Sequence, residues 1–255
     1  MRVTILGCGA SGGVPVVGCQ CAVCRSDNPK NKRTRTSALI EVGDARLLID
    51  SSPDLRQQAL RERLTRVDGV LYTHNHADHT NGVDDLRAFN YHRNAALDIY
   101  GTQAFLAHFT NQFRYAFQPP ATPWYRPALV ANEIQEYDDF SVNNLRVRSF
   151  LQLHGKSKTL GYRIGNMAYS TDVDNLPDES LQLLESLDLW VVDCLRYNPS
   201  PTHANLAMTL GWIEQFKPKR AVLIHMNHDM DYDTLRAQLP PHVEPAYDGL
   251  VIECL

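Results

Sequence analysis

Residues 73–80 read T-H-N-H-A-D-H-T and directly follow a short apolar run. Imidazole nitrogens and carboxylate oxygens together are the ligand mixture that holds divalent transition metals. In an extended segment His74 and His76 project to the same side of the chain. Asp78 and His79 lie beyond the strand end, where the chain can turn them toward a second position. The spacing therefore predicts two metals rather than one.

Single residues of the same ligand types recur downstream, each at the end of an apolar, β-branched run. These residues are His154, Asp172 and His225. Strand ends that meet at one edge of the sheets would bring them to the same place as residues 73–80. A polar, histidine-rich loop or separate surface histidines are the alternatives, and neither accounts for this repeated placement.

The order and spacing of these residues resemble the metallo-β-lactamase superfamily, whose signature H-x-H-x-D-H is matched at 74–79. The resemblance covers nearly the whole chain. It implies an α/β fold, an αββα sandwich of two mixed β-sheets packed face to face, with helices on both outer faces. It also implies two metals bridged by Asp172, one held by His74, His76, His154 and Asp172, the other by Asp78, His79, Asp172 and His225.

A second cluster, Cys19, Cys21 and Cys24 in G-C-Q-C-A-V-C, can direct three thiols at one tetrahedral zinc. Zinc normally takes a fourth ligand, and His228 at the end of H-M-N-H is the natural candidate. With the preceding G-G-V-P, this pattern resembles the phosphodiesterases related to PhnP, in which such a zinc is structural. Three unrelated buried thiols, or a disulfide that leaves one thiol over, are the alternatives.

Length and composition favour one large α/β core. The chain has 255 residues, of which 44% are hydrophobic. We expect a single domain over 1–255 with the zinc knuckle inserted at about 18–35. Unpaired cysteines suit a reducing compartment, and no apolar run has the length of a signal peptide core or a membrane span. We therefore expect a cytoplasmic protein without membrane contact.

The charge balance argues against a polyanionic partner. The formal net charge is -4, whereas proteins that hold nucleic acid usually display a basic face. The one concentrated basic stretch, residues 30–35, is interpreted as a solvated loop. We expect a small-molecule substrate and no nucleic acid; a homodimer remains open.

Periodicity gives a coarse map of the elements. Strands are predicted at 3–6, 38–42, 46–49, 70–72, 97–100, 145–150, 161–164, 167–169, 189–192, 221–224 and 250–253. Helices are predicted at 53–64 (capped by Ser51 or Ser52), 102–116, 177–187, 203–216 and 232–239.

The resemblance implies a dinuclear-metal-dependent phosphodiesterase. Two cations about 3.5 to 4 Å apart can lower the pKa of a shared water to about 7, so a metal-bridging hydroxide is the expected nucleophile. The departing alkoxide needs a proton, and His203 is the predicted acid; a helix-start histidine facing solvent is the alternative. Asp78 is placed with His203 among the catalytic residues. Manganese or zinc would fill the active site, and one structural zinc the knuckle.

The implied substrate is a small cyclic ribose phosphodiester, opened to a phosphomonoester. A tRNase Z-like endonuclease should carry a basic arm, which the sequence lacks, and a non-catalytic PqqB-like carrier could dispense with some of the seven ligands. A thioesterase or β-lactamase would lack the knuckle. Residues 82–91 and 118–127 could provide specificity, a lid or a dimer contact. Asp50 could orient a ligand histidine or cap a helix, and Arg196 could bind a second phosphate.

Overall fold

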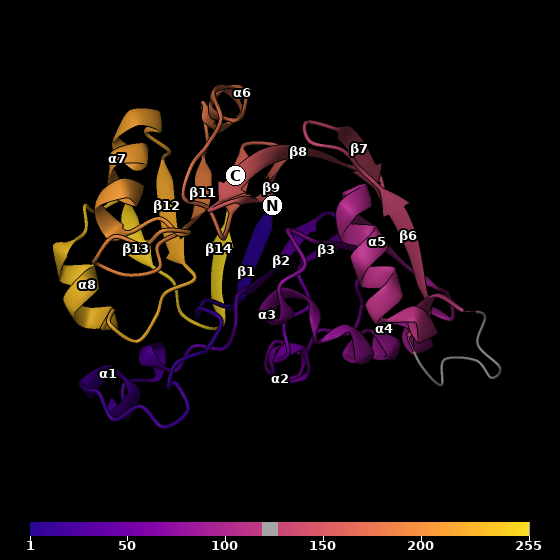
Figure 1. Cartoon of the computed structure of the whole chain (residues 1–255), viewed down its shortest axis with the longest axis horizontal. Helices are drawn as coiled ribbons and strands as arrows, with labels where there is room; N and C mark the ends of the chain where they lie inside the picture. Colours follow the sequence, from indigo (N-terminus) through magenta and orange to yellow (C-terminus); the bar gives the residue numbers. More distant parts are fainter. Residues whose placement is uncertain (119–126, 255) are drawn as a thin grey trace.

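The computed structural model describes residues 1–118 and 127–254 (Figure 1). Most of the expected lid or dimer segment, 118–127, lies outside the described residues. Within the described part, two seven-stranded mixed sheets form the centre of the molecule. The first has the order β14-β1-β2-β3-β4-β5-β6 and the second the order β13-β12-β11-β10-β9-β8-β7.

The strands of the first sheet are β1 (Arg2–Gly7), β2 (Ser37–Val42), β3 (Ala45–Ile49), β4 (Gly69–Leu71), β5 (Leu97–Gly101), β6 (Leu129–Glu133) and β14 (Leu250–Glu253). Those of the second are β7 (Asp139–Val142), β8 (Leu145–His154), β9 (Ser157–Ile164), β10 (Met167–Ser170), β11 (Leu189–Asp193), β12 (Arg220–Ile224) and β13 (Val243–Pro245). Strands β3 to β6 are parallel, as are β10 to β13. The carboxyl ends of each parallel group therefore meet at one edge.

The α-helices are α1 (Ala22–Arg25), α2 (Leu55–Arg61), α3 (Ala77–Thr80), α4 (Arg87–Arg93), α5 (Gln103–Gln112), α6 (Asp178–Leu181), α7 (Leu206–Phe216) and α8 (Tyr232–Gln238). Short 3-10 turns lie at Pro29–Asn31, Val83–Leu86, Arg114–Phe117 and Gln182–Leu184. Figure 1 shows α2 to α5 on the side of the first sheet and α7 and α8 beside β12 and β13. No helix within these described ranges combines the length and apolar character needed to cross a bilayer.

The main core lies between the two sheets. Ile40 and Leu47 of the first sheet belong to the same buried cluster as Phe150 and Val191 of the second. Because side chains alternate along a strand, the neighbouring Leu48 faces the other way and packs with α2, α4 and α5. Both faces of the first sheet are thus buried, which explains its continuous apolar strands and confirms the expected two-sheet αββα arrangement.

Of the strands in the described part of the chain, sequence periodicity predicted all except β6, β7 and β13. All three are edge strands. An edge strand pairs on one side only; β6 exposes three of its five residues and β7 two of its four, and polar residues make up part of each. The third is only three residues long and ends in proline. The missing signal therefore follows from their position at the sheet edges.

Several predicted helix boundaries are wrong. Neither Ser51 nor Ser52 caps α2; the helix begins at Leu55 after Asp54, and Ser52 instead accepts a hydrogen bond from the Asp54 N–H. Asn205 caps α7, so the helix predicted from 203 starts at Leu206. The predictions at 102–116 and 177–187 each break into an α-helix and a 3-10 turn. Helices α1, α3 and α4 were not predicted.

Candidate metal centre

The first group of predicted ligands comes from three strand ends. His74 and His76 follow β4, His154 ends β8, and Asp172 follows β10. Each residue offers one ligand atom, and these four atoms all lie within 4.8 Å of one another. The Nε2 atoms of His74 and His154 lie 3.8 and 3.9 Å from the same Asp172 oxygen, Oδ1. The four residues predicted for one metal are therefore assembled.

The second group lies beside the first. Asp78, His79 and His225 also bring ligand atoms within 4.8 Å of one another. The His79 Nε2 atom is 3.2 Å from Asp78 Oδ2 and 3.1 Å from Asp172 Oδ2, and the His225 Nδ1 atom is 3.5 Å from Asp172 Oδ2. One oxygen of Asp172 thus faces the first group and the other faces the second, as the predicted bridge requires.

Backbone conformation contributes to this convergence. Asp172 and His225 have φ angles of 53° and 58°, in the left-handed region. Such conformations cost about 1 to 3 kcal/mol each and persist only where the surroundings fix them. Here each turns a side chain inward at the end of a buried parallel strand, β10 or β12, so the cost is incurred at the residues that complete the two groups.

The donor set fits metal ions. In the described part of the chain, the buried Nε2 atom of His74 has no hydrogen-bond partner. A buried polar atom without a partner is unfavourable, and a metal ion would satisfy this nitrogen. Burial also lowers the pKa of His74 well below its usual value and lowers that of His225. Both imidazoles are therefore held neutral, which is the form that binds a metal.

The carboxylates supply the opposite charge. Burial alone would raise the pKa of Asp172, but His225, His79 and His74 together lower it well below its usual range. Burial would lower the pKa of His79, yet Asp172, Asp50 and Asp78 raise it well above its usual value. The cluster of carboxylates therefore favours positive charge at the centre of the site.

Asp50 orients His79, one of the predicted ligands. Its carboxylate is fully buried and accepts a hydrogen bond from His79 Nδ1 at 2.7 Å, and others from the N–H and hydroxyl of Thr73. The helix-capping alternative is wrong, because Asp54 precedes α2. His154 is fixed in the same way: its Nδ1 donates to the Thr202 carbonyl at 2.5 Å. Such partners set the ring orientation and the basicity of a ligand histidine.

His203 lies beside both groups. Its side chain is only 13% exposed, its ring stacks on His225 at 5.0 Å between centroids, and its Nε2 atom is 3.9 Å from Asp172 Oδ1. A histidine facing solvent is therefore excluded. Its Nδ1 atom lies 3.1 Å from Asp193 Oδ2. Sequence reasoning missed Asp193, although its position at the end of β11 was a usable signal.

Arg196 contacts its own loop. Its guanidinium donates to the carbonyls of Asn198 and Pro199, at 3.2 and 2.7 Å. The side chain therefore holds its own loop, and nothing in this arrangement assigns it to a second phosphate.

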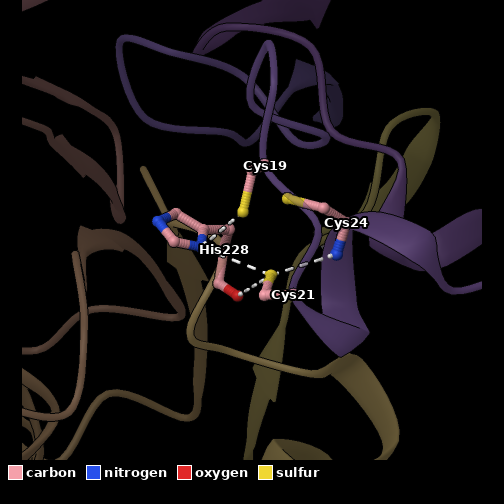
Figure 2. A group of neighbouring side chains, drawn as sticks. All are labelled: Cys19, Cys21, Cys24 and His228. Atoms are coloured by element: carbon pink, nitrogen blue, oxygen red, sulfur yellow. Dashed lines mark hydrogen bonds between the residues drawn. The ribbon is translucent and has the colours of Figure 1, made fainter.

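The cysteine knuckle is a third group. Figure 2 shows the thiols of Cys19, Cys21 and Cys24 directed with the His228 ring toward a common point, and their ligand atoms lie within 4.8 Å of one another. The His228 Nδ1 atom is 3.7 Å from Cys19 Sγ and 3.4 Å from Cys21 Sγ. Hydrogen bonds from the Cys24 N–H and from His228 lower the pKa of Cys21 to about 6, which favours the thiolate that zinc needs. All six cysteines are free thiols, so no disulfide competes.

Comparisons with known proteins agree with this geometry. A family profile described as "Beta-lactamase superfamily domain" matches residues 45–226. The crystal structure of a new diphosphatase from the PhnP family is 33% identical, with a TM-score of 0.92, and the match covers 100% of this chain and 98% of that one. Zn²⁺-bound PqqB from Methylobacterium extorquens shares the fold at 20% identity and a TM-score of 0.81, over 100% of both chains.

One curated relative introduces a different activity. An octanoyltransferase of Porphyromonas gingivalis is 41% identical over 254 residues, which are 98% of this chain but 51% of that protein. The chain thus spans about half the length of this relative, and less of the next most similar ones. The family match, by contrast, includes all seven residues predicted to bind the active-site metals. This chain belongs to the beta-lactamase superfamily and has the metallo-β-lactamase fold.

Proposed function

We propose that this metallo-β-lactamase-fold hydrolase is a dinuclear-metal-dependent phosphodiesterase that converts a small cyclic ribose phosphodiester to a phosphomonoester. The observation that carries the proposal is the meeting of two ligand groups at Asp172, with His203 beside them. The similarity to a PhnP-family diphosphatase at 33% identity supports phosphorus chemistry.

The residues divide into two ligand sets and a proton donor. His74, His76, His154 and Asp172 would hold one cation, and Asp78, His79, His225 and Asp172 the other. When bound, two divalent cations, manganese or zinc, would supply Lewis acidity toward the phosphoryl oxygens and a nucleophile at neutral pH. Asp50 and Thr202 hold the rings of His79 and His154 in place.

His203 is placed to protonate the leaving group. Burial alone would lower its pKa, but the hydrogen bond to Asp193 and the charge of that carboxylate raise it above the usual value. Asp193 accepts the Nδ1 proton, which leaves Nε2–H directed at the ligand groups. A protonated imidazole in this position can donate to a departing alkoxide, for which general acids contribute about 10² to 10⁴ in rate.

Three other functions have less support. A PqqB-like carrier has no need of a proton donor held by a buried carboxylate, so the His203–Asp193 pair favours catalysis. A tRNase Z-like nuclease would have to hold a long polyanion, and the net charge of -4 disfavours that. The octanoyltransferase relative suggests acyl-group chemistry, but the match covers only 51% of that protein.

The test compares a phosphodiester with a phosphomonoester. Purified protein is loaded in turn with manganese and zinc, metal is counted per chain, and hydrolysis of bis(p-nitrophenyl) phosphate and p-nitrophenyl phosphate is followed. We expect turnover of the diester and little of the monoester, lost in Asp172→Ala and retained in Asp178→Ala, an exposed control on α6. A metal-replete protein inert to the diester would overturn the proposal.

A further inference from the structure

Thr73 links the first ligand group to a carboxylate that also serves the second. Its hydroxyl oxygen lies 2.8 Å from Asp50 Oδ2 and 3.0 Å from Nδ1 of the neighbouring His74. The same Asp50 oxygen lies 2.7 Å from His79 Nδ1. All four residues are buried, with at most 6% of any of them exposed. Asp50 therefore contacts His79 of the second group directly and reaches His74 of the first group through one hydroxyl.

The end of β4 makes this contact possible. Side chains of adjacent residues point to opposite sides of a regular strand, but β4 already ends at Leu71. Beyond it, the Thr73 N–H donates to Asp50 Oδ1 at 2.8 Å, and the Thr73 carbonyl accepts from the Leu160 N–H at 2.9 Å. These bonds use only the backbone of Thr73, so its hydroxyl is left to act on His74.

The single proton of the hydroxyl sets the direction of each hydrogen bond. A threonine hydroxyl has one proton, and an ionised carboxylate has none. The contact of 2.8 Å between Thr73 Oγ1 and Asp50 Oδ2 joins two oxygens and therefore requires the hydroxyl proton. The hydroxyl can then only accept from His74. In the neutral ring, Nδ1 consequently carries the proton and Nε2 carries a lone pair.

This lone pair faces the first ligand group. His74 Nε2 is buried, has no hydrogen-bond partner in the part of the chain that the structure describes, and lies 3.8 Å from Asp172 Oδ1. The opposite tautomer would direct an N–H at the position of the metal. A ring that exchanged between the two tautomers would bind a metal in only one of them, so fixing the tautomer beforehand raises the affinity.

We propose that Thr73 is a positioning residue for the first metal: its hydroxyl connects His74 to the Asp50 carboxylate and fixes the ring as the Nδ1–H tautomer. Asp50 thereby orients one histidine of each ligand group. The inference rests on the metal centre of the proposed function, but it does not depend on which ester is hydrolysed. Thr73 itself is not a metal ligand.

The tautomer is observed by NMR in the zinc-loaded, full-length protein with isotope-labelled histidine. Long-range nitrogen–proton correlations show which ring nitrogen carries the proton, and His74→Gln identifies the signals of His74 by their loss. We expect the wild-type proton on Nδ1. In Thr73→Val this proton loses its acceptor and should exchange with water about tenfold faster, while Thr73→Ser should keep the wild-type rate. A proton on Nε2 of His74 in the wild type would overturn the proposal.

Zinc affinity gives the second measurement. In competition with a chelator, Thr73→Val should bind one active-site zinc about tenfold more weakly, and Thr73→Ser should bind it as the wild type does. Thr4→Val is the matched control, because Thr4 is also 3% exposed, lies on β1 and belongs to neither ligand group. Equal zinc affinity in the wild type and Thr73→Val, or an equal loss in Thr73→Ser, would overturn the proposal.

Failure of the proposed function would give a different pattern of results. A protein whose His74 proton and zinc affinity depend on the Thr73 hydroxyl, but which hydrolyses no phosphodiester, refutes the phosphodiesterase and retains this inference. Phosphodiester hydrolysis by a protein with the His74 proton on Nε2 refutes the role of Thr73 alone.

Discussion

Replacing Asp193 by asparagine tests the role of His203 most sharply. The substitution preserves shape, and the amide oxygen can still accept the Val173 N–H bond that Asp193 Oδ2 accepts at 3.1 Å. It removes the negative charge 3.1 Å from His203 Nδ1. A hydrogen bond to a charged partner contributes about 1.5 to 3 kcal/mol, against about 1 kcal/mol for a neutral one. The difference of about 0.5 to 2 kcal/mol corresponds to a fall of roughly one unit in the pKa of His203.

The direction of the pH effect follows from the role of the acid. Asp193 raises the pKa of His203 above its usual value, and His203 must be protonated to donate. Activity that needs the acid is therefore lost as pH rises through this pKa, and Asp193→Asn should move the loss roughly one unit toward lower pH. At neutral pH, turnover of a diester with an alkoxide leaving group should fall by up to about tenfold, because a shift of one unit lowers the protonated fraction of His203 by no more than that.

The assay separates acid catalysis from other damage. A p-nitrophenolate leaving group needs little protonation, so its diester should lose no more than about threefold in Asp193→Asn. Metal content should stay at the wild-type value, and Asp188→Asn, just before β11, serves as the control. An equal loss of turnover for the two diesters, or a pH profile that does not shift, would refute the role of His203 as the acid.

Three further substitutions probe the ligand groups. Asp172→Ala removes the carboxylate that faces both groups, so we expect both active-site metals to be lost while the knuckle zinc stays. Mass spectrometry of metals counts the ions bound per chain. Retained wild-type turnover would refute the bridge. Asp50→Asn removes the negative charge from the acceptor of the His79 Nδ1 proton and should weaken metal affinity roughly 10- to 100-fold in a chelator competition. Cys21→Ser should lose one zinc per chain, and its Tm should fall by several degrees, because structural zinc contributes to folding. Calorimetry measures the Tm, and zinc is counted in the same sample. A stable, zinc-replete but inactive variant would contradict the structural role.

The two candidate ligand groups were predictable because their residues follow local rules. His74, His76, Asp78 and His79 fall in one short segment, and the other ligands end apolar strands whose burial the periodicity already showed. The partners of these ligands were not predictable in the same way. Asp193 meets His203 across ten residues, and the Thr202 carbonyl meets His154 across 48. Such pairs depend on how strand ends and loops meet in three dimensions, and a single sequence carries no pattern for that.

The turn after β12 joins the knuckle to the active-site ligands. His225 belongs to the second ligand group and His228 to the cysteine group, only three residues later. Between them, the Met226 N–H donates to the Cys8 carbonyl at 2.9 Å. The buried guanidinium of Arg33 donates to the Asn227 carbonyl at 3.0 Å. A zinc at the knuckle would fix one end of this turn, and β12 fixes the other.

The position of His225 therefore depends on both ends of that turn. Its left-handed backbone, with a φ of 58°, is stable only while the residues around it are held. Zinc binding by Cys19, Cys21 and Cys24 would add this constraint from a segment about 200 residues away in sequence. A structural zinc distant from the reacting atoms can in this way contribute to metal affinity at the active site, because it stabilises the conformation that presents His225.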